Sequence, residues 1–93
     1  MKRPHNPRRI VRSQQFIRER DELASRIATI PDIMVGVEWV LEHEPERGQQ
    51  IMDDPPLHAW PTHDHLNNVG LTIYYTIDED AVTLLSIREV AVL

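Results

Sequence analysis

Residues 71–77 read LTIYYTI, and this stretch decides the expected fold. Large apolar or aromatic residues alternate with threonine and tyrosine, so one face of the extended chain is apolar. The residue types favour β-structure. The stretch therefore predicts a strand whose Ile73 and Tyr75 face a hydrophobic core.

More strands are predicted on both sides of this stretch. Residues 81–87 read AVTLLSI, and the acidic residues 78–80 form a tight turn, so the two strands make a hairpin. Upstream, residues 49–52 are a weak strand candidate. Residues 57–60 are a candidate for a short edge strand, because Pro61 is tolerated at an edge but not inside a sheet.

Two helices in tandem are predicted ahead of these strands. The first covers residues 13–29 with Ser13 as its N-cap, and the second covers residues 31–44 and opens at Pro31. Each has an apolar stripe at helical spacing. Residues 8–12, β-branched at their centre, are a candidate first strand of the sheet.

Helices first and antiparallel strands afterwards predict an α+β fold, with two N-terminal helices packed on a small antiparallel β-sheet. We expect residues 1–7 to be a flexible basic N-terminal arm and residues 8–93 to be a single domain. Trp39 and Trp60 are expected to be core or half-buried packing residues. The expected core between helices and sheet consists of Phe16, Leu23, Ile27, Ile33, Val37, Leu41, Ile73, Tyr75, Ile77 and Leu85.

Length and composition limit the class of protein. A chain of 93 residues has room for one domain, which buries roughly 60 to 65% of its unfolded surface. The chain contains no cysteine, which excludes disulfides, iron-sulfur clusters and thiol catalysis. No apolar run approaches the roughly 18 residues of a membrane span, and the first residues lack the apolar core of a signal peptide. We therefore expect a cytoplasmic protein with no membrane association.

The charge is distributed unevenly along the chain. The net charge is -5, yet residues 1–20 contain seven basic residues and one acidic residue. The remainder of the chain is therefore strongly acidic. The basic segment is either a solvated tail or an arm that binds nucleic acid, an acidic partner or the acidic body itself. The acidic body alone repels phosphates.

Three histidines are close in sequence: His58, His63 and His65, with Asp64 between the last two. In an extended segment, His63 and His65 project from the same face. Histidine can transfer protons near neutral pH, and RNA cleavage through the 2′-hydroxyl needs an acid and a base. The same residues could bind a transition metal, or they could simply belong to a polar loop. We assign no metal and no cofactor.

The order strand, two helices, three strands resembles the RelE/ParE superfamily of small toxins from bacterial type II toxin-antitoxin pairs. The likeness is carried mainly by residues 66–87, LNNVGLTIYYTIDEDAVTLLSI, which combine leucine, glycine, a β-rich stretch ending in tyrosine and an acidic turn. The tract from Phe16 through Trp39 to Gly48 is similar to the two-helix region of the family. The resemblance covers residues 8–90 and implies a cognate antitoxin as partner. Apolar residues that include Met34, Val35, Val92 and Leu93 are too many for one core, so we expect a disordered antitoxin segment to dock on an apolar groove beside the helices and to fold as it binds.

The resemblance also implies site residues. RelE-type members cleave messenger RNA on the ribosome, with basic residues on the sheet and an arginine for the strained phosphate. Where such a chain has this arginine, the sequence has Thr72, and His63 and His65 stand where the family has lysines. Arg88 is the best remaining phosphate contact, although an ion pair with a carboxylate of the body is an alternative. The resemblance therefore implies His63, His65 and Arg88 as catalytic residues, and Tyr74, Thr72 and His58 as substrate-binding residues.

Two functions follow from these observations. The first is a toxin-like component of a type II toxin-antitoxin pair, either a weak ribosome-dependent mRNA endonuclease or a ParE-like protein directed at DNA gyrase. The second is a non-catalytic protein-binding module that keeps the fold without the nuclease site. Loss of a positive charge beside the reacting phosphate costs about 2 to 4 kcal/mol, so we expect little or no cleavage of free RNA.

Overall fold

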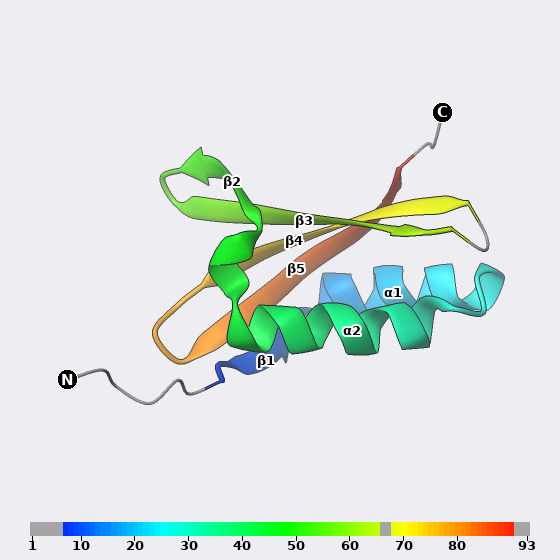
Figure 1. Cartoon of the computed structure of the whole chain (residues 1–93), viewed down its shortest axis with the longest axis horizontal. Coiled ribbons are helices and arrows are strands. Elements are labelled where there is room, and N and C mark those ends of the chain that lie inside the picture. The colour runs from blue at the N-terminus through cyan, green and yellow to red at the C-terminus, as the bar shows by residue number, and fades with distance from the viewer. Residues whose placement is uncertain (1–6, 66–67, 91–93) are drawn as a thin grey trace.

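The computed structural model describes residues 7–65 and 68–90. One mixed five-stranded sheet has the strand order β1-β5-β4-β3-β2, and both helices lie on one of its faces (Figure 1). Its first strand is parallel to its last strand, and the other neighbouring strands are antiparallel. In chain order the elements are β1 (Arg9–Arg12), α1 (Gln14–Arg26), α2 (Ile30–His43), the 3-10 helix η1 (Pro45–Arg47), β2 (Gln49–Asp53), β3 (Pro56–Asp64), β4 (Val69–Ile77) and β5 (Ala81–Val90).

The fold is α+β, but the predicted arrangement of two N-terminal helices on a small antiparallel sheet is wrong. The helices follow a strand, β1, and the sheet has five strands and is mixed. Residues 8–12 had the composition of a strand, but their partner is β5, about seventy residues later. Two parallel strands this far apart in sequence are not joined by a short turn, so no local sequence pattern identifies them as partners. Residues 1–6, most of the predicted flexible arm, lie outside the described residues.

The predicted hairpin is confirmed as β4 and β5, with one irregularity that the alternation missed. Ile73 pairs with Ile87 and Tyr74 with Ser86, but Tyr75 pairs with Leu84. Leu85 is therefore the extra residue of a β-bulge. The bulge removes Leu85 from the core, where we had predicted it.

The two predicted helices are confirmed, and Ser13 is the N-cap of α1. Its hydroxyl accepts a hydrogen bond from the backbone N–H of Phe16 at 3.0 Å. The helix ends at Arg26, three residues before the predicted end, and Ile27 is extended. The second helix begins at Ile30, with Pro31 in its first turn, where proline costs no helical hydrogen bond.

The strand predicted for residues 57–60 is longer than expected and is not an edge strand. It extends over β3, which lies between β2 and β4. Proline is accepted inside this strand because β2 pairs with β3 only as far as Ala59. At Pro61 the strand therefore has a neighbour on one side alone, as at an edge.

The core lies between the helix pair and the inner face of the sheet. Seven of the ten predicted core residues are buried, and Ile33 and Ile77 are half-buried and pack against them. Trp60 is half-buried beside this core as expected, but the prediction for Trp39 is wrong, since 61% of its surface is exposed. The core also includes buried residues that the core prediction omitted: Ile30, Met34, Leu71, Val82, Leu84 and Ile87.

A buried tyrosine anchors the connection between the helices and the sheet. The Tyr75 hydroxyl donates a hydrogen bond of 2.6 Å to the carbonyl oxygen of Pro45. Burial, which is the largest effect, raises the pKa of Tyr75 to about 12. Gly48 lies against this hydroxyl, because a Cβ added to Gly48 would be 1.9 Å from the tyrosine oxygen. Only glycine at position 48 therefore allows the backbone to lie this close to the Tyr75 hydroxyl.

Candidate functional site

Most of the predicted site residues lie on the outer face of the sheet, which is the face away from the helices. Opposite residues of antiparallel strands point to the same face, and Ile73 points to the core, so Thr72 and Tyr74 point outward. Arg88 pairs with Thr72 and is exposed on this outer face. His63 on β3 pairs with Gly70, which lies two residues before Thr72 on β4. His63 therefore faces outward too.

Arg88 does not extend freely over the outer face. Its Nε lies 3.2 Å from a carboxylate oxygen of Glu19 and donates a hydrogen bond of 3.0 Å to the hydroxyl of Ser86. The Ser86 hydroxyl in turn donates a hydrogen bond of 2.7 Å to Glu19. Arg88 therefore forms an ion pair with a carboxylate, as the alternative predicted, but this carboxylate belongs to Glu19 of the basic N-terminal segment and not to the acidic body.

Glu19 also completes the hydrogen bonding of β5 beyond the end of β1. β1 pairs with β5 only as far as Leu84. Past that point, the Ser13 hydroxyl donates to the carbonyl oxygen of Leu85 at 3.0 Å. The backbone N–H of Ile87 donates to Glu19 at 3.1 Å. Side chains at the start of α1 therefore replace a neighbouring strand.

These contacts determine the charge state of Glu19. Partial burial opposes its ionisation, but the hydrogen bonds from Ser86 and Ile87 and the charge of Arg88 outweigh burial and lower the pKa of Glu19. The carboxylate therefore remains ionised in the folded protein over the neutral and mildly acidic range. Its charge offsets that of Arg88, which is the one arginine or lysine in β3, β4 and β5.

Replacing Glu19 with glutamine is expected to lower the free energy of unfolding by about 1 to 2 kcal/mol at pH 7, because hydrogen bonds to a charged acceptor are lost. The folded pKa lies below the unfolded value of about 4.3, so this contribution is present above that pH and disappears as the pH falls through the folded pKa. Urea unfolding at pH 7 and at pH 3 measures it. The neighbouring exposed Glu22→Gln is the matched control, and an equal loss in both variants would contradict the assignment.

His63 and His65 are together, as predicted, but are separate from Arg88. Their rings meet edge to face with centroids 4.2 Å apart. β3 and β5 are separated by β4, so the Cα atoms of His63 and Arg88 are more than about 10 Å apart. The structure thus brings together two of the three predicted catalytic residues and holds the third elsewhere.

His58 lies on the opposite face of the sheet from the other predicted substrate-binding residues. It pairs with Tyr75 and stacks on the Tyr75 ring, with centroids 5.5 Å apart. Its Nδ1 is buried and has no hydrogen-bond partner among the described residues. His58 therefore packs beside the core, whereas Thr72 and Tyr74 remain on the outer face.

Metal binding has no clear location in the described part of the chain. Within residues 7–65 and 68–90, no three histidine, aspartate or glutamate side chains converge as they would around a metal ion. Asp64 instead accepts a hydrogen bond from the hydroxyl of Thr29, the residue just before α2. None of the described helices is long and apolar enough to cross a membrane.

A shallow hollow of about 470 Å³ lies on the outer face, and Tyr74 and Arg88 both line it. Leu57, Leu85 and Gln15 form the rest of its lining with Ser86. Its open form and the ion pair of Arg88 leave it poorly suited to gripping a phosphate in a reaction.

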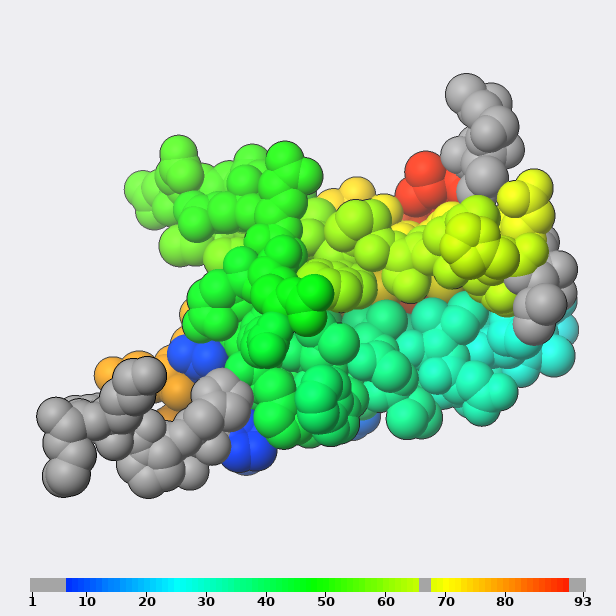
Figure 2. All heavy atoms as spheres, viewed as in Figure 1, coloured from blue at the N-terminus to red at the C-terminus, as the bar shows by residue number. Residues whose placement is uncertain are grey.

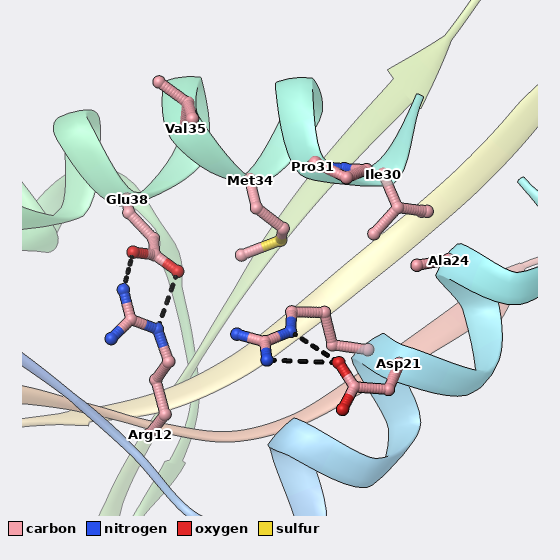
Figure 3. Close-up of a pocket in the computed structure, with 9 residues that line it drawn as sticks. Arg12, Asp21, Ala24, Ile30, Pro31, Met34, Val35 and Glu38 are labelled. Carbon is pink, nitrogen blue, oxygen red and sulfur yellow. Dashed lines mark hydrogen bonds and ion pairs between the residues drawn. The ribbon is translucent and has the colours of Figure 1, made fainter. Parts of the chain in front are cut away.

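A second candidate site is a groove between α1 and α2, shown in Figure 3. Its volume is about 400 Å³, and Ala24, Ile30, Pro31, Met34 and Val35 supply its apolar lining. Val35 is 73% exposed at its edge. The sequence predicts an apolar groove beside the helices from Met34, Val35, Val92 and Leu93, of which Met34 and Val35 line this groove, whereas Val92 and Leu93 lie outside the described residues. The other lining residues were not predicted, because the groove exists only once the two helices lie side by side.

Charged pairs of opposite sign border this groove. Arg12 forms a two-point ion pair with Glu38 (Figure 3). Arg20 binds Asp21 through its Nε and one terminal nitrogen at 3.2 and 3.1 Å. The hydrogen bond to Glu38 is the main cause that raises the pKa of Arg12. An apolar floor with a rim of both charges is typical of a surface that receives an amphipathic segment of another protein.

Comparisons with known proteins identify no family for this chain. No protein-family model matches it, and no curated protein matches its sequence. The contacts described above are therefore the basis for a functional proposal.

Proposed function

We propose that this chain is the toxin-like component of a bacterial type II toxin-antitoxin pair, and that it acts by binding protein partners in the cytoplasm, with weak RNA cleavage at most. The observation that carries this proposal is the apolar groove between α1 and α2. The toxin-like class comes from the resemblance to the RelE/ParE superfamily. The order of a strand, two helices and further strands supports it, although four strands rather than three follow the helices.

The groove favours a particular kind of partner segment. Apolar residues of the segment would contact Ala24, Pro31 and Val35, which have exposed surface in the groove. Its charges would face Arg20 and Asp21 on the rim. An antitoxin segment that folds as it binds meets these requirements, because its apolar side is buried only in the complex.

The outer face supports binding rather than catalysis. Its central arginine, Arg88, is already compensated by Glu19, and Thr72 supplies no charge. Stabilisation of a developing phosphate charge needs donors directed at that phosphate. Arg88 directs its Nε at Glu19 and Ser86 instead.

A second candidate function is ribosome-dependent mRNA cleavage by His63 and His65. The contact between their rings favours it, because two imidazoles side by side could serve as acid and base. This mode needs both histidines, whereas the binding mode needs neither.

The antitoxin of such a pair is encoded by the reading frame next to that of the toxin. Expression of the chain in a bacterial host that lacks this adjacent reading frame is expected to arrest growth. The combined variant His63→Ala, His65→Ala and Arg88→Ala is expected to arrest growth to the same extent, because the binding surface is intact. Loss of arrest in this variant, with normal expression, would favour the nuclease. Absence of arrest with the wild type would contradict a toxin and favour the non-catalytic module.

Co-expression with the protein encoded by the adjacent reading frame tests the groove in the same host. This partner is expected to restore growth with the wild type but not with Val35→Arg, which places a charge at the apolar edge of the groove. Met52→Arg, an exposed apolar position on β2, is the matched control and should be rescued as well as the wild type. Equal rescue of both variants would exclude the groove as the docking site.

A further inference from the structure

An exposed stripe runs along the solvent side of α2, separate from the groove-lining residues. Asp32, Gly36, Trp39 and His43 are spaced by four, three and four residues, so they follow one line along the helix. We call this line the α2 stripe. In Figure 2, α2 lies at the front of the molecule below β3, and no other element covers it.

Trp39 is an ordered aromatic side chain at the centre of the stripe. It is largely exposed, yet its ring stacks on His43 with centroids 4.4 Å apart and an interplanar angle of 26°. His43 is held in turn, because its Nδ1 lies 2.8 Å from the carbonyl oxygen of Trp39. An exposed tryptophan that is fixed before binding is a typical anchor of a protein interface.

Gly36 provides a slot on the same stripe. A Cβ added to Gly36 would meet no atom within 4 Å, so the space above it is open. A hollow of about 320 Å³ lies beside it, lined in part by Ile33, Val40 and Trp60. Glycine weakens a helix relative to alanine, but it allows a partner side chain to approach the backbone closely.

The spacing of the four stripe residues is the same when read in either direction along the helix. Two copies of the stripe can therefore face each other in antiparallel orientation with their residues in register. If two α2 helices lie antiparallel about the midpoint of the α2 stripe, between Val37 and Glu38, Gly36 of each copy is opposite Trp39 of the other. Asp32 of each copy is then opposite His43 of the other, which places an acidic first turn against a last turn that carries a basic residue. Antiparallel helix dipoles favour the same arrangement.

The other acidic residues of α2 do not oppose this pairing. Glu38 binds Arg12, and Glu42 is close enough to Arg12 to contribute to its raised pKa, so both lie toward α1 and β1. Glu44, just after the helix, pairs with Arg47. The ionisable groups on the stripe itself are thus Asp32 and His43.

We propose that this chain forms a two-fold symmetric dimer in which α2 packs antiparallel against α2 of a second copy, with each Trp39 seated over the other copy's Gly36. This proposal is independent of the groove and of toxin activity. A single pair of helices is smaller than a standard interface, so the dimer is weak and depends on concentration.

Sedimentation equilibrium of the full chain over a concentration series measures this association. Trp39→Ala and Gly36→Leu are each expected to weaken dimerisation by about tenfold or more, because one removes the anchor and the other fills its slot. The monomer has room for a side chain at Gly36, so Gly36→Leu still folds, which circular dichroism verifies. Met52→Ala, an exposed apolar position on β2, is the control and should change association by less than about twofold.

A wild-type chain that is monomeric up to about 1 mM would overturn the proposal, as would unchanged association of Gly36→Leu. If the stripe binds a different protein and not a second copy, the purified wild type is monomeric, and the dimer proposal is overturned. Neither a monomeric wild type nor unchanged association of Gly36→Leu affects the groove or the growth-arrest tests.

Cysteine cross-linking tests the antiparallel register, because the native chain has no cysteine. The double variant Asp32→Cys, His43→Cys is expected to form a disulfide-linked dimer under mild oxidation. Within one helix the two positions are about 16 Å apart, which is too far for an internal disulfide. The single variants should remain mostly unlinked. Efficient cross-linking of either single variant would show parallel pairing and overturn the proposed register.

Discussion

Replacing Gly48 with alanine is expected to lower the free energy of unfolding by about 3 kcal/mol. The new Cβ would lie 1.9 Å from the Tyr75 hydroxyl oxygen and 3.0 Å from the carbonyl oxygen of Ala59. Neither group can move easily, because Tyr75 is fully buried and its hydroxyl binds Pro45, and the Ala59 carbonyl belongs to β3. Backbone conformation is not the cause, since φ of Gly48 is -71°. Chemical denaturation of the purified variant measures the effect.

A second substitution separates this collision from other causes. Tyr75→Phe alone is expected to cost about 1 to 2 kcal/mol, because the Pro45 carbonyl loses a buried hydrogen bond. In the double variant the worst contact is gone, so the combined loss should be smaller than the sum of the two single losses by about 1 kcal/mol or more. Strictly additive losses would contradict the proposed contact.

Gly36→Ala is the matched control for glycine substitution. Gly36 lies in the middle of α2, and an added Cβ meets nothing within 4 Å. Alanine is the better helix former, so this variant is expected to be more stable by about 0.5 to 1 kcal/mol. The same chemical change should thus have opposite signs at the two glycines.

Replacing Leu84 with alanine is expected to cost about 3 kcal/mol, within the usual range for a buried leucine, whereas Leu85→Ala should cost about 1 kcal/mol or less. Leu84 is fully buried beside Tyr75, and Leu85 is the bulged residue, half-buried at the hollow of the outer face. Thermal or urea unfolding of the two variants compares them directly. A larger loss for Leu85 would show that β5 follows the regular alternation and has no bulge at this position.

The same two leucines show where sequence reasoning succeeded and where it failed. The alternation in residues 71–77 identified β4 and its inner face, because in a regular strand the face to which a side chain points follows from its place in the alternation alone. On β5 the alternation assigned Leu85 to the core, because a bulge depends on the register with β4 and leaves no mark in the apolar pattern. Trp39 was misplaced for a similar reason, since its size suggests burial although its position on α2 faces away from the sheet.

The candidate sites were predicted to different extents. Adjacency in sequence was sufficient to place His63 and His65 on one face, and their ring contact confirms it. The partner of Arg88 could not be identified, because Glu19 is far away in sequence and reaches it only after α1 packs along β5. An apolar groove beside the helices was predicted from the surplus of apolar residues such as Met34 and Val35, but its other lining residues and charged rim were not, since they depend on the angle at which the two helices meet.

The position of β5 in the sheet has a consequence for the order in which the protein can fold during synthesis. Of the strands in the described residues, β5 is the last to leave the ribosome, yet it lies between β1 and β4. Until it emerges, β1 has no partner strand, Glu19 has no Ile87 N–H or Arg88 to bind, and the core lacks Val82, Leu84 and Ile87. Contacts over such long sequence separations form late because closing the loop between them costs chain entropy. The nascent chain therefore exposes the apolar faces of both helices and of β4 until residues 81–90 are available, and chaperone binding to truncated nascent chains would be greatest just before that point.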